Sequence, residues 1–174
     1  MKPLRRILTV VLALLLLAVL VGILFIQHLK PDYEGEQSLP GLRDAVDVYY
    51  DPYGIPHIYA ASETDGFRAL GYAHAQDRLW QMDLLRRVAP GRLSEVFGSQ
   101  TLETDKFFLT LGISDATRAL LRTADTTGVE YQLALAYLEG VNAFIDEGPA
   151  PVEYYLTGLE KEHFSLEDVY NSIG

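Results

Sequence analysis

The chain has 174 residues, of which 49% are hydrophobic, and it carries a formal net charge of −10 and no cysteine. This apolar content can support a folded core, which excludes a disordered chain. The absence of cysteine excludes a disulfide scaffold. The negative charge excludes a nucleic-acid binder, because a phosphate backbone would be repelled. The charge is unevenly distributed, since every acidic residue lies beyond position 27.

Residues 7–26 form the single long apolar run, which excludes a polytopic membrane protein. A helix of this length rises about 30 Å, which matches a bilayer core. Basic residues precede the run and acidic residues follow it, so the positive-inside rule places residues 1–6 in the cytoplasm and the rest on the exported side, periplasmic or extracellular. The alternative is a cleaved signal peptide, but its apolar region is shorter and residues 25–31 offer no small-x-small site. The sequence therefore favours an uncleaved transmembrane signal-anchor.

A linker and a β-hairpin are predicted next. Residues 27–44 are polar and contain Pro and Gly, which is typical of a linker between membrane and domain. Residues 45–50 and 55–60 are rich in β-formers and flank Asp51-Pro52-Tyr53-Gly54, which suits a type I turn. Pro56 cannot donate a ladder hydrogen bond, so the second strand is expected at an edge or to be irregular there.

The rest of the chain is predicted to be helical. Gly and Pro positions and hydrophobic periodicity predict helices over 62–88, 92–97, 101–110, 114–123 and 127–146. Capping-box patterns open at Ser62, Thr127 and Ser165, and residues 148–151 form a loop. A lone hairpin is not independently stable, and the helix opened by Ser165 has barely begun at Gly174. The sequence therefore indicates a fragment, or one subunit, of something larger.

One face of the predicted helix 62–88 has polar side chains between apolar ones. At helical spacing this face carries Phe67, Leu70, His74, Asp77, Gln81 and Leu84. One interpretation is an active-site wall or a His/Asp metal site. The favoured interpretation is a buried polar network that fixes helix packing, with Asp77 and Arg78 each paired to other elements, because buried charges must be paired. No third ligand has matching spacing, so no metal-ligating or cofactor-binding residue is assigned.

Two further constellations each have a catalytic and a structural interpretation, and a third has only a structural one. Asp51 and His57 could act as orienter and base, but a lock across the hairpin turn is favoured. Gly98-Ser99 could be an autoproteolysis site, but a helix stop is favoured. Arg86-Arg87 complements a helix dipole at a C-terminus. The chain contains no Gly-x-Ser-x-Gly, P-loop or HExxH motif, so spacing alone discloses no reaction and no catalytic residue is assigned.

Two strings, residues 48–60 and 69–82, resemble the opening motifs of the penicillin acylase family. The second contains the run Ala73-His74-Ala75-Gln76-Asp77-Arg78. Further landmarks of the family follow in order and extend the resemblance over residues 46–174: Arg86-Arg87, Gly91-Arg92-Leu93-Ser94-Glu95, Phe97-Gly98, Asp105, the Gly140-Val141-Asn142 helix, Pro151-Val152-Glu153-Tyr154 and Glu167-Asp168-Val169. One departure is residues 106–110, where the family often has an arginine.

The resemblance implies an N-terminal-nucleophile amidohydrolase of αββα fold, exported as one precursor and cut autocatalytically into α and β subunits. The nucleophile would be the N-terminal serine of β, with its own amino group as base and an oxyanion hole beside it. Substrates in the family include β-lactam antibiotics and acyl-homoserine lactones, and some members bind a structural calcium. The resemblance assigns no catalytic role to His74, Asp77, Arg78 or Gln81.

We therefore expect an α+β, mostly helical fragment with one N-terminal β-hairpin and a single transmembrane helix. Residues 45–174 would be a partial α subunit, whose partners are the β subunit of the same precursor, the membrane and a small amide substrate. The nucleophile and the calcium ligands would lie outside this chain, which alone would be inactive. The alternative hypothesis is a stand-alone membrane-tethered binding module without catalysis.

Overall fold

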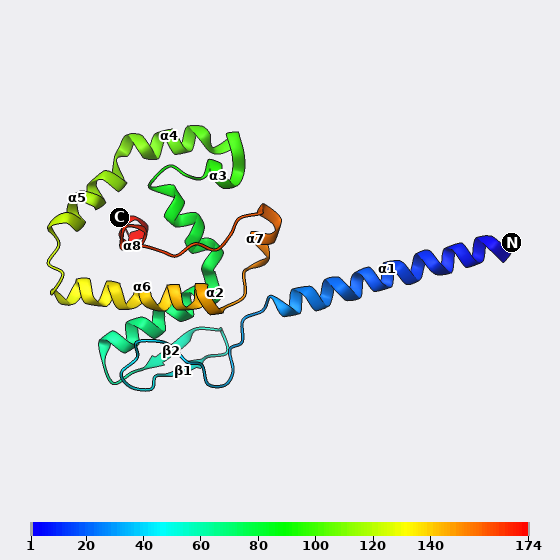
Figure 1. The fold of residues 1–174 in the computed structure, drawn as a ribbon, viewed down its shortest axis with the longest axis horizontal. Helices are drawn as coiled ribbons and strands as arrows, with labels where there is room; N and C mark the ends of the chain where they lie inside the picture. The colour runs from blue at the N-terminus through cyan, green and yellow to red at the C-terminus, as the bar shows by residue number, and fades with distance from the viewer. Residues whose placement is uncertain (1, 174) are drawn as a thin grey trace.

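A long helix and a β-hairpin precede a set of helices in the computed structural model, which describes residues 2–173 (Figure 1). The structure is mostly helical, with one two-stranded antiparallel sheet in the described part, as expected. In chain order the elements are α1 (Lys2–His28), β1 (Asp47–Tyr50), β2 (Pro56–Tyr59), α2 (Glu63–Val88), α3 (Ser94–Phe97), the 3-10 helix η1 (Gly98–Thr101), α4 (Leu102–Leu111), α5 (Ile113–Thr123), α6 (Val129–Glu147), α7 (Val152–Thr157) and α8 (Leu166–Ile173).

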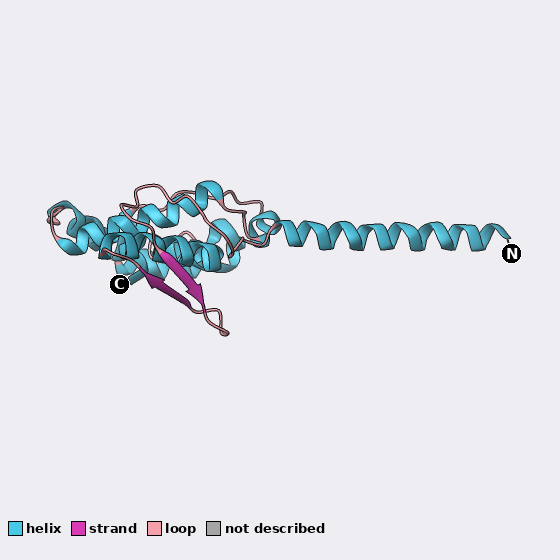
Figure 2. Ribbon diagram, turned by 90° about the horizontal axis from the view of Figure 1, so that it is seen from below, coloured by secondary structure: helices cyan, strands magenta, loops and turns pink. Residues whose placement is uncertain are grey.

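Helix α1 extends away from the other elements in both views (Figures 1 and 2). Its stretch Arg5–His28 is the one helix of residues 2–173 that is long and apolar enough to cross a membrane, and its apolar window has no buried residue. A signal sequence near an N-terminus has the same properties. The helix ends where Pro31 cannot continue it. The Leu, Val and Ile side chains of this run are exposed, and contact between so much apolar surface and water is unfavourable. The run therefore needs an apolar environment.

The predicted hairpin is confirmed. β1 and β2 pair antiparallel with Asp47 opposite Tyr59 and Tyr50 opposite Pro56. The N–H of Gly54 donates to the carbonyl of Asp51 at 2.9 Å and closes the turn. Because the sheet has only two strands in residues 2–173, both strands are edges, and Pro56 sits at the first position of β2, where its missing donor costs least.

Helix α2 begins where the sequence predicts, because the Ser62 hydroxyl accepts from the Asp65 N–H at 3.2 Å. It ends at Val88, and Gly91 then takes a positive φ of 64°. The one departure lies inside the helix. Arg78 has non-helical φ and ψ values of −142° and 25°, which divides α2 into two segments at a kink that the sequence pattern does not reveal.

The crossing of α2 and α6 is the main packing contact of the domain. A Cβ on Gly71 of α2 would lie 2.0 Å from the Tyr137 carbonyl oxygen, and a Cβ on Gly140 of α6 would lie 1.9 Å from the Arg68 carbonyl oxygen. Each glycine therefore admits the backbone of the opposite helix. The buried core surrounds this crossing and consists of Ala75, Leu79, Leu138, Val141, Phe144, Ile145, Tyr154, Phe164 and Val169.

One local prediction, the Thr127 cap, is wrong. Thr127 does not cap α6: its N–H and hydroxyl donate to the Asp125 carboxylate at 2.9 and 2.7 Å, and Gly128 occupies the N-cap position without a side-chain bond. The Asx-type turn of Asp125 competes successfully for Thr127. The predicted loop 148–151 is confirmed, and it leads into the short helix α7, which has no counterpart among the predicted helices and begins directly after its N-cap residue Pro151.

Helices α3, α4 and α5 form an arc on one side of the crossing (Figure 1). The predicted break between α4 and α5 is confirmed, since Gly112 takes a left-handed conformation with φ 70°. The predicted cap of α8 is also confirmed, because the Ser165 hydroxyl accepts from the Asp168 N–H at 3.2 Å. Asn171 of α8 donates to the Ser114 hydroxyl of α5 at 3.2 Å, which joins the arc to the C-terminal helix.

The glycine crossing gives a stability prediction. We expect Gly71→Ala to destabilise the fold by about 3 kcal/mol or more, because the new methyl meets backbone that cannot move aside. The control is Gly66→Ala in the same helix, where the nearest atom would be the Ala60 Cβ at an ordinary 3.5 Å. That substitution is expected to stabilise by about 0.5–1 kcal/mol. Chemical denaturation of both variants measures the difference; equal free energies of unfolding would contradict the close approach.

Candidate functional site

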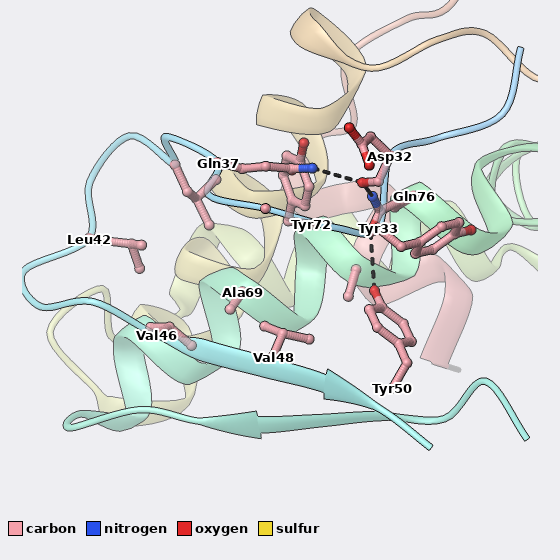
Figure 3. Close-up of a pocket in the computed structure, with 13 residues that line it drawn as sticks. Asp32, Tyr33, Gln37, Leu42, Val46, Val48, Tyr50, Ala69, Tyr72 and Gln76 are labelled. Atoms are coloured by element: carbon pink, nitrogen blue, oxygen red, sulfur yellow. Dashed lines mark hydrogen bonds between the residues drawn. The ribbon is translucent and has the colours of Figure 1, made fainter. Parts of the chain in front are cut away.

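A small pocket lies between α2, β1 and the segment predicted as a linker (Figure 3). We call residues 32–43 of this segment the strap. The Asp32 carbonyl accepts from the Gln76 side chain at 2.7 Å and from the Gln37 side chain at 2.8 Å. The Tyr50 hydroxyl donates to the side-chain amide oxygen Oε1 of Gln76 at 3.1 Å. The strap is therefore held against α2 by specific hydrogen bonds.

The pocket encloses about 160 Å³, and its polar groups are used to hold the strap. Burial raises the pKa of both Tyr33 and Tyr50, and the hydrogen bond of the Tyr33 hydroxyl to Asp77 raises it further in Tyr33. Both phenols are therefore protonated at neutral pH. None of the residues that line the pocket is a serine, threonine, cysteine, histidine or lysine. The arrangement positions the strap and has no nucleophile–base pair.

The polar face predicted on α2 lies on the more exposed side of the helix, not in a buried network. Asp77 and Gln81 are exposed. Asp77 accepts from the Tyr33 hydroxyl of the strap at 2.8 Å, so its predicted pairing with another element is confirmed. Arg78 is exposed at the kink. In the described residues, no group of three His, Cys, Asp or Glu side chains is placed to hold a metal ion.

His74 is half-buried, and its Nδ1 lies 3.1 Å from the Tyr137 hydroxyl of α6. Burial lowers the pKa of His74, the nearby Arg78 lowers it further, and Asp77 opposes the shift. The imidazole is therefore neutral at pH 7. His74 lines an apolar groove of about 600 Å³ between α2, α6 and α8, together with Phe67, Leu70, Met82, Leu85, Leu133, Tyr137, Phe164, Val169 and others. We call this the α2–α6–α8 groove.

Asp51 and His57 have the geometry of a hairpin lock. One Asp51 carboxylate oxygen accepts the N–H groups of Tyr53 and Ile55 at 2.8 and 2.9 Å. The other lies 3.6 Å from His57 Nε2. The Ile55 N–H is the main cause of the lowered pKa of Asp51, with Tyr53 and His57 adding to it. The groups that contact the Asp51 carboxylate all belong to the turn or to β2. This is the arrangement that the favoured interpretation, a lock across the hairpin turn, predicts.

The arginine pair at the end of α2 does much more than complement a helix dipole. Arg86 and Arg87 are 3% and 2% exposed and share the fully buried carboxylate of Asp83, at 2.6 and 3.2 Å. Arg87 also binds Glu95 of α3, and Arg86 binds Glu162 at 3.3 Å. We call these five residues the buried ion network. A buried guanidinium needs such partners, because an unpaired charge there would cost several kcal/mol.

The buried ion network joins three parts of the chain, namely α2, α3 and the segment 158–165. The Arg86 guanidinium also donates to the His163 carbonyl at 3.1 Å and lies 4.4 Å from the centre of the Phe164 ring. Asn142 of α6 fixes the same segment, since its side chain donates to the Phe164 carbonyl at 2.9 Å and accepts from the Phe164 N–H at 2.8 Å. Sequence motifs far apart therefore meet at Phe164.

Asp105 of α4 caps α3. Its carboxylate is 3% exposed and accepts the N–H groups of Leu93 and Ser94, both at 2.8 Å, as well as the Ser94 hydroxyl. Burial by itself raises the pKa of Asp105, but the Ser94 hydroxyl and the two N–H donors outweigh it and hold the pKa below its usual range. The carboxylate thus supplies the N-terminal charge that α3 needs.

Comparison with known proteins assigns the fold. The sequence profile described as penicillin amidase matches residues 45–174. The chain belongs to the penicillin amidase family. It is 45% identical over 139 residues to the penicillin acylase 2 proenzyme of Pseudomonas sp. strain SE83, covering 79% of this chain and 18% of that protein. It is 34% identical over 140 residues to the acyl-homoserine lactone acylase QuiP of Pseudomonas aeruginosa, covering 79% and 16%.

The structure is also similar to a solved penicillin amidase relative. The thermostable penicillin G acylase of Alcaligenes faecalis superposes with a TM-score of 0.63 at 27% identity, covering 75% of this chain and 71% of that chain. By contrast, the present chain spans less than a fifth of the length of the two curated relatives, since its matches cover 18% and 16% of them. The residues that match the family profile, 45–174, include the hairpin, the α2–α6 crossing and the buried ion network of this chain.

Sequence reasoning missed the most constrained residues of this penicillin amidase segment. The position of Arg86 and Arg87 at a helix end predicts only a dipole interaction, and it does not point to Asp83. A usable signal exists: a single acid, Asp83, stands three residues before Arg86 and four before Arg87, on a helix that also carries Leu79 in the core. This spacing indicates an intrahelical cluster on the buried face. No comparable pattern points to Glu162, which approaches only in the folded chain.

The buried ion network predicts a large cost for removing one arginine. We expect Arg87→Met to destabilise the protein by about 3–5 kcal/mol, because the fully buried carboxylate of Asp83 loses one of its two guanidinium partners while the side-chain volume is kept. Arg118→Met is the control, since Arg118 pairs with Asp115 at an exposed site, where a pair contributes about 0–1 kcal/mol. Urea denaturation separates the two; a small effect of Arg87→Met would contradict the assignment.

Acid is expected to destabilise the fold through Asp105 and Asp65. Donors to both carboxylates hold their folded pKa values below the unfolded value, although burial opposes this. Their stabilisation is therefore complete above the unfolded pKa of about 3.9 and is lost as pH falls through the folded pKa. In Asp105→Asn, the melting temperature should be lower at pH 7 and fall less between pH 4 and pH 2. The exposed Asp115→Asn control should melt like the parent chain; a parent-like acid slope in Asp105→Asn would contradict the assignment.

Proposed function

We propose that this chain is the N-terminal, non-catalytic part of an exported amidohydrolase precursor that cleaves linear amides. The observation that carries the proposal is the family match over residues 45–174 in a chain whose candidate pockets hold no nucleophile–base pair. The nucleophile is then supplied by a second subunit of the same precursor. The substrate is a small amide that joins an acyl group to an amine, as the printed names of the relatives suggest for those proteins.

In the proposed reaction, an N-terminal serine of the second subunit attacks the amide carbonyl, and its own α-amino group accepts the hydroxyl proton. The tetrahedral intermediate is stabilised by oxyanion donors and collapses with protonation of the leaving amine. Water then hydrolyses the acyl-enzyme. The residues of the present chain take no step in this reaction: they position the subunit that does.

The lengths of the relatives support a precursor that is cut into chains. The penicillin acylase 2 protein is named a proenzyme and is more than four times as long as this chain, since the same match covers 79% of one and 18% of the other. The matched chain of the solved penicillin G acylase is similar in length to the present chain, because the match covers 75% of this chain and 71% of that one. A short chain and a long proenzyme in one family fit the proposed maturation.

Two surfaces of the chain fit a docking role for the second subunit. The hairpin has two free edges within residues 2–173, with Tyr49 and Tyr59 61% and 63% exposed on one face. The α2–α6–α8 groove leaves Phe67 and Leu85 40% and 54% exposed. Open sheet edges and apolar grooves of this kind are stabilised when another chain covers them. We propose that they complete the αββα fold with the second subunit.

We propose further that α1 is an uncleaved membrane anchor through residues 7–26, which holds the domain on the exported side. Its length, its exposed apolar surface and the three basic residues that precede the run support this orientation. A structural calcium of the full-length protein is proposed to be bound by ligands outside this chain.

The gene and the mature protein test this proposal. We expect the reading frame to continue past codon 174 into a Gly-Ser-Asn type junction, and mass spectrometry of the purified protein to find a second chain beginning with serine. Replacing that serine with alanine should leave the precursor uncut and abolish hydrolysis of acyl-4-nitroanilides. A stop codon after Gly174 together with cooperative melting of the isolated chain would contradict the proposal and favour a stand-alone binding module.

A further inference from the structure

Helix α7 presents an apolar stripe that the core does not use. Val152, Tyr155 and Leu156 stand at positions i, i+3 and i+4 and therefore share one face. They are 40%, 57% and 79% exposed. The opposite face holds Tyr154, which is 4% exposed and meets the Trp80 ring edge-on at 5.4 Å. The helix is thus fixed to the domain through Tyr154 and keeps its other apolar side chains in the open.

The stripe lies beside the end of the apolar run in α1. The rings of Phe25 and Tyr155 are in edge-to-face contact, with 5.2 Å between their centres. Figure 1 places α7 at the edge of the domain nearest to α1 and places α5 at the opposite edge, and Figure 2 keeps the same arrangement of α1 and the domain. The apolar surface of α1 therefore continues onto α7.

The contact with Phe25 sets the depth of α7 in a bilayer. If residues 7–26 fill the hydrocarbon core of about 30 Å, Phe25 lies within about one helical turn of its outer boundary. A ring 5.2 Å from Phe25 must then lie at or near the same boundary. Tyrosine is enriched at this depth, because its ring is apolar and its hydroxyl reaches the headgroups. The exposed Lys30 just beyond α1 can place its ammonium in the same layer.

We propose that α7 is a membrane-interface helix, which inserts Val152, Tyr155 and Leu156 into the outer headgroup layer next to the exit of α1. The inference rests on the proposed anchor and adds a second lipid contact, made by the exported domain itself. A lipid surface, rather than another protein chain, is favoured because the stripe is continuous with the lipid-facing surface of α1. Two contacts would fix the orientation of the domain on the bilayer, which a single helix would leave free to rotate.

Site-specific fluorescence tests the inference in the full chain reconstituted into phosphatidylcholine vesicles. The 174 residues contain no cysteine, so a single introduced cysteine carries the only environment-sensitive label. Leu156→Cys is the test position. Leu120→Cys on α5 is the matched control, because Leu120 is also an exposed leucine, at 55%. Val19→Cys reports on the anchor. All three side chains are exposed, so the labels remove no core contact.

We expect the label at position 156 to lose most of its emission to spin-labelled lipids and little to aqueous iodide, with the opposite pattern at 120. Lipid quenching at 19 together with iodide quenching at 156 would overturn the interface helix and leave the anchor standing. A label at 156 shielded from both quenchers would overturn it in favour of a covering protein chain. Absence of lipid quenching at both 19 and 156 would overturn the interface helix and the anchor together.

Discussion

The close approach of α2 and α6 at Gly71 and Gly140 is the constraint on which the rest of this structure depends. Each glycine faces a carbonyl of the opposite helix, so the two backbones touch directly at this crossing. The short interaxial distance brings Val141 and Phe144 of α6 against Ala75 and Leu79 of α2, and these side chains form the core. Any side chain at either glycine would separate the helices and open that core.

Once the crossing is formed, polar contacts orient the segments around it. Asn142, two residues after Gly140, holds the backbone of Phe164 by two hydrogen bonds, and the Phe164 ring lies against the guanidinium of Arg86. The buried ion network then joins α3 to the end of α2. Such a network is a costly way to gain stability, but it specifies one arrangement, since every member loses a partner if a segment shifts.

The domain is well ordered internally yet leaves large apolar surfaces open. These surfaces are the α2–α6–α8 groove, the hairpin and the α7 stripe, and they have two proposed neighbours. The groove and hairpin suit a second subunit of the penicillin amidase fold, whereas the α7 stripe adjoins the apolar run of α1. The proposed function, in which this chain positions a catalytic subunit near a membrane, needs both kinds of surface.

The sequence by itself determined the elements that depend on neighbouring residues. The hairpin turn at Asp51, the start of α2 at Ser62 and the break at Gly112 follow from local hydrogen bonds and backbone preference, and the ordered motifs identified the family. Only the tertiary structure decided which faces are buried. His74 and Asp77 share a face with apolar residues, yet the buried charges in the second half of α2 are Asp83, Arg86 and Arg87. Their partners Glu95 and Glu162 come from other segments, and contacts between distant segments leave no periodic signal in the chain.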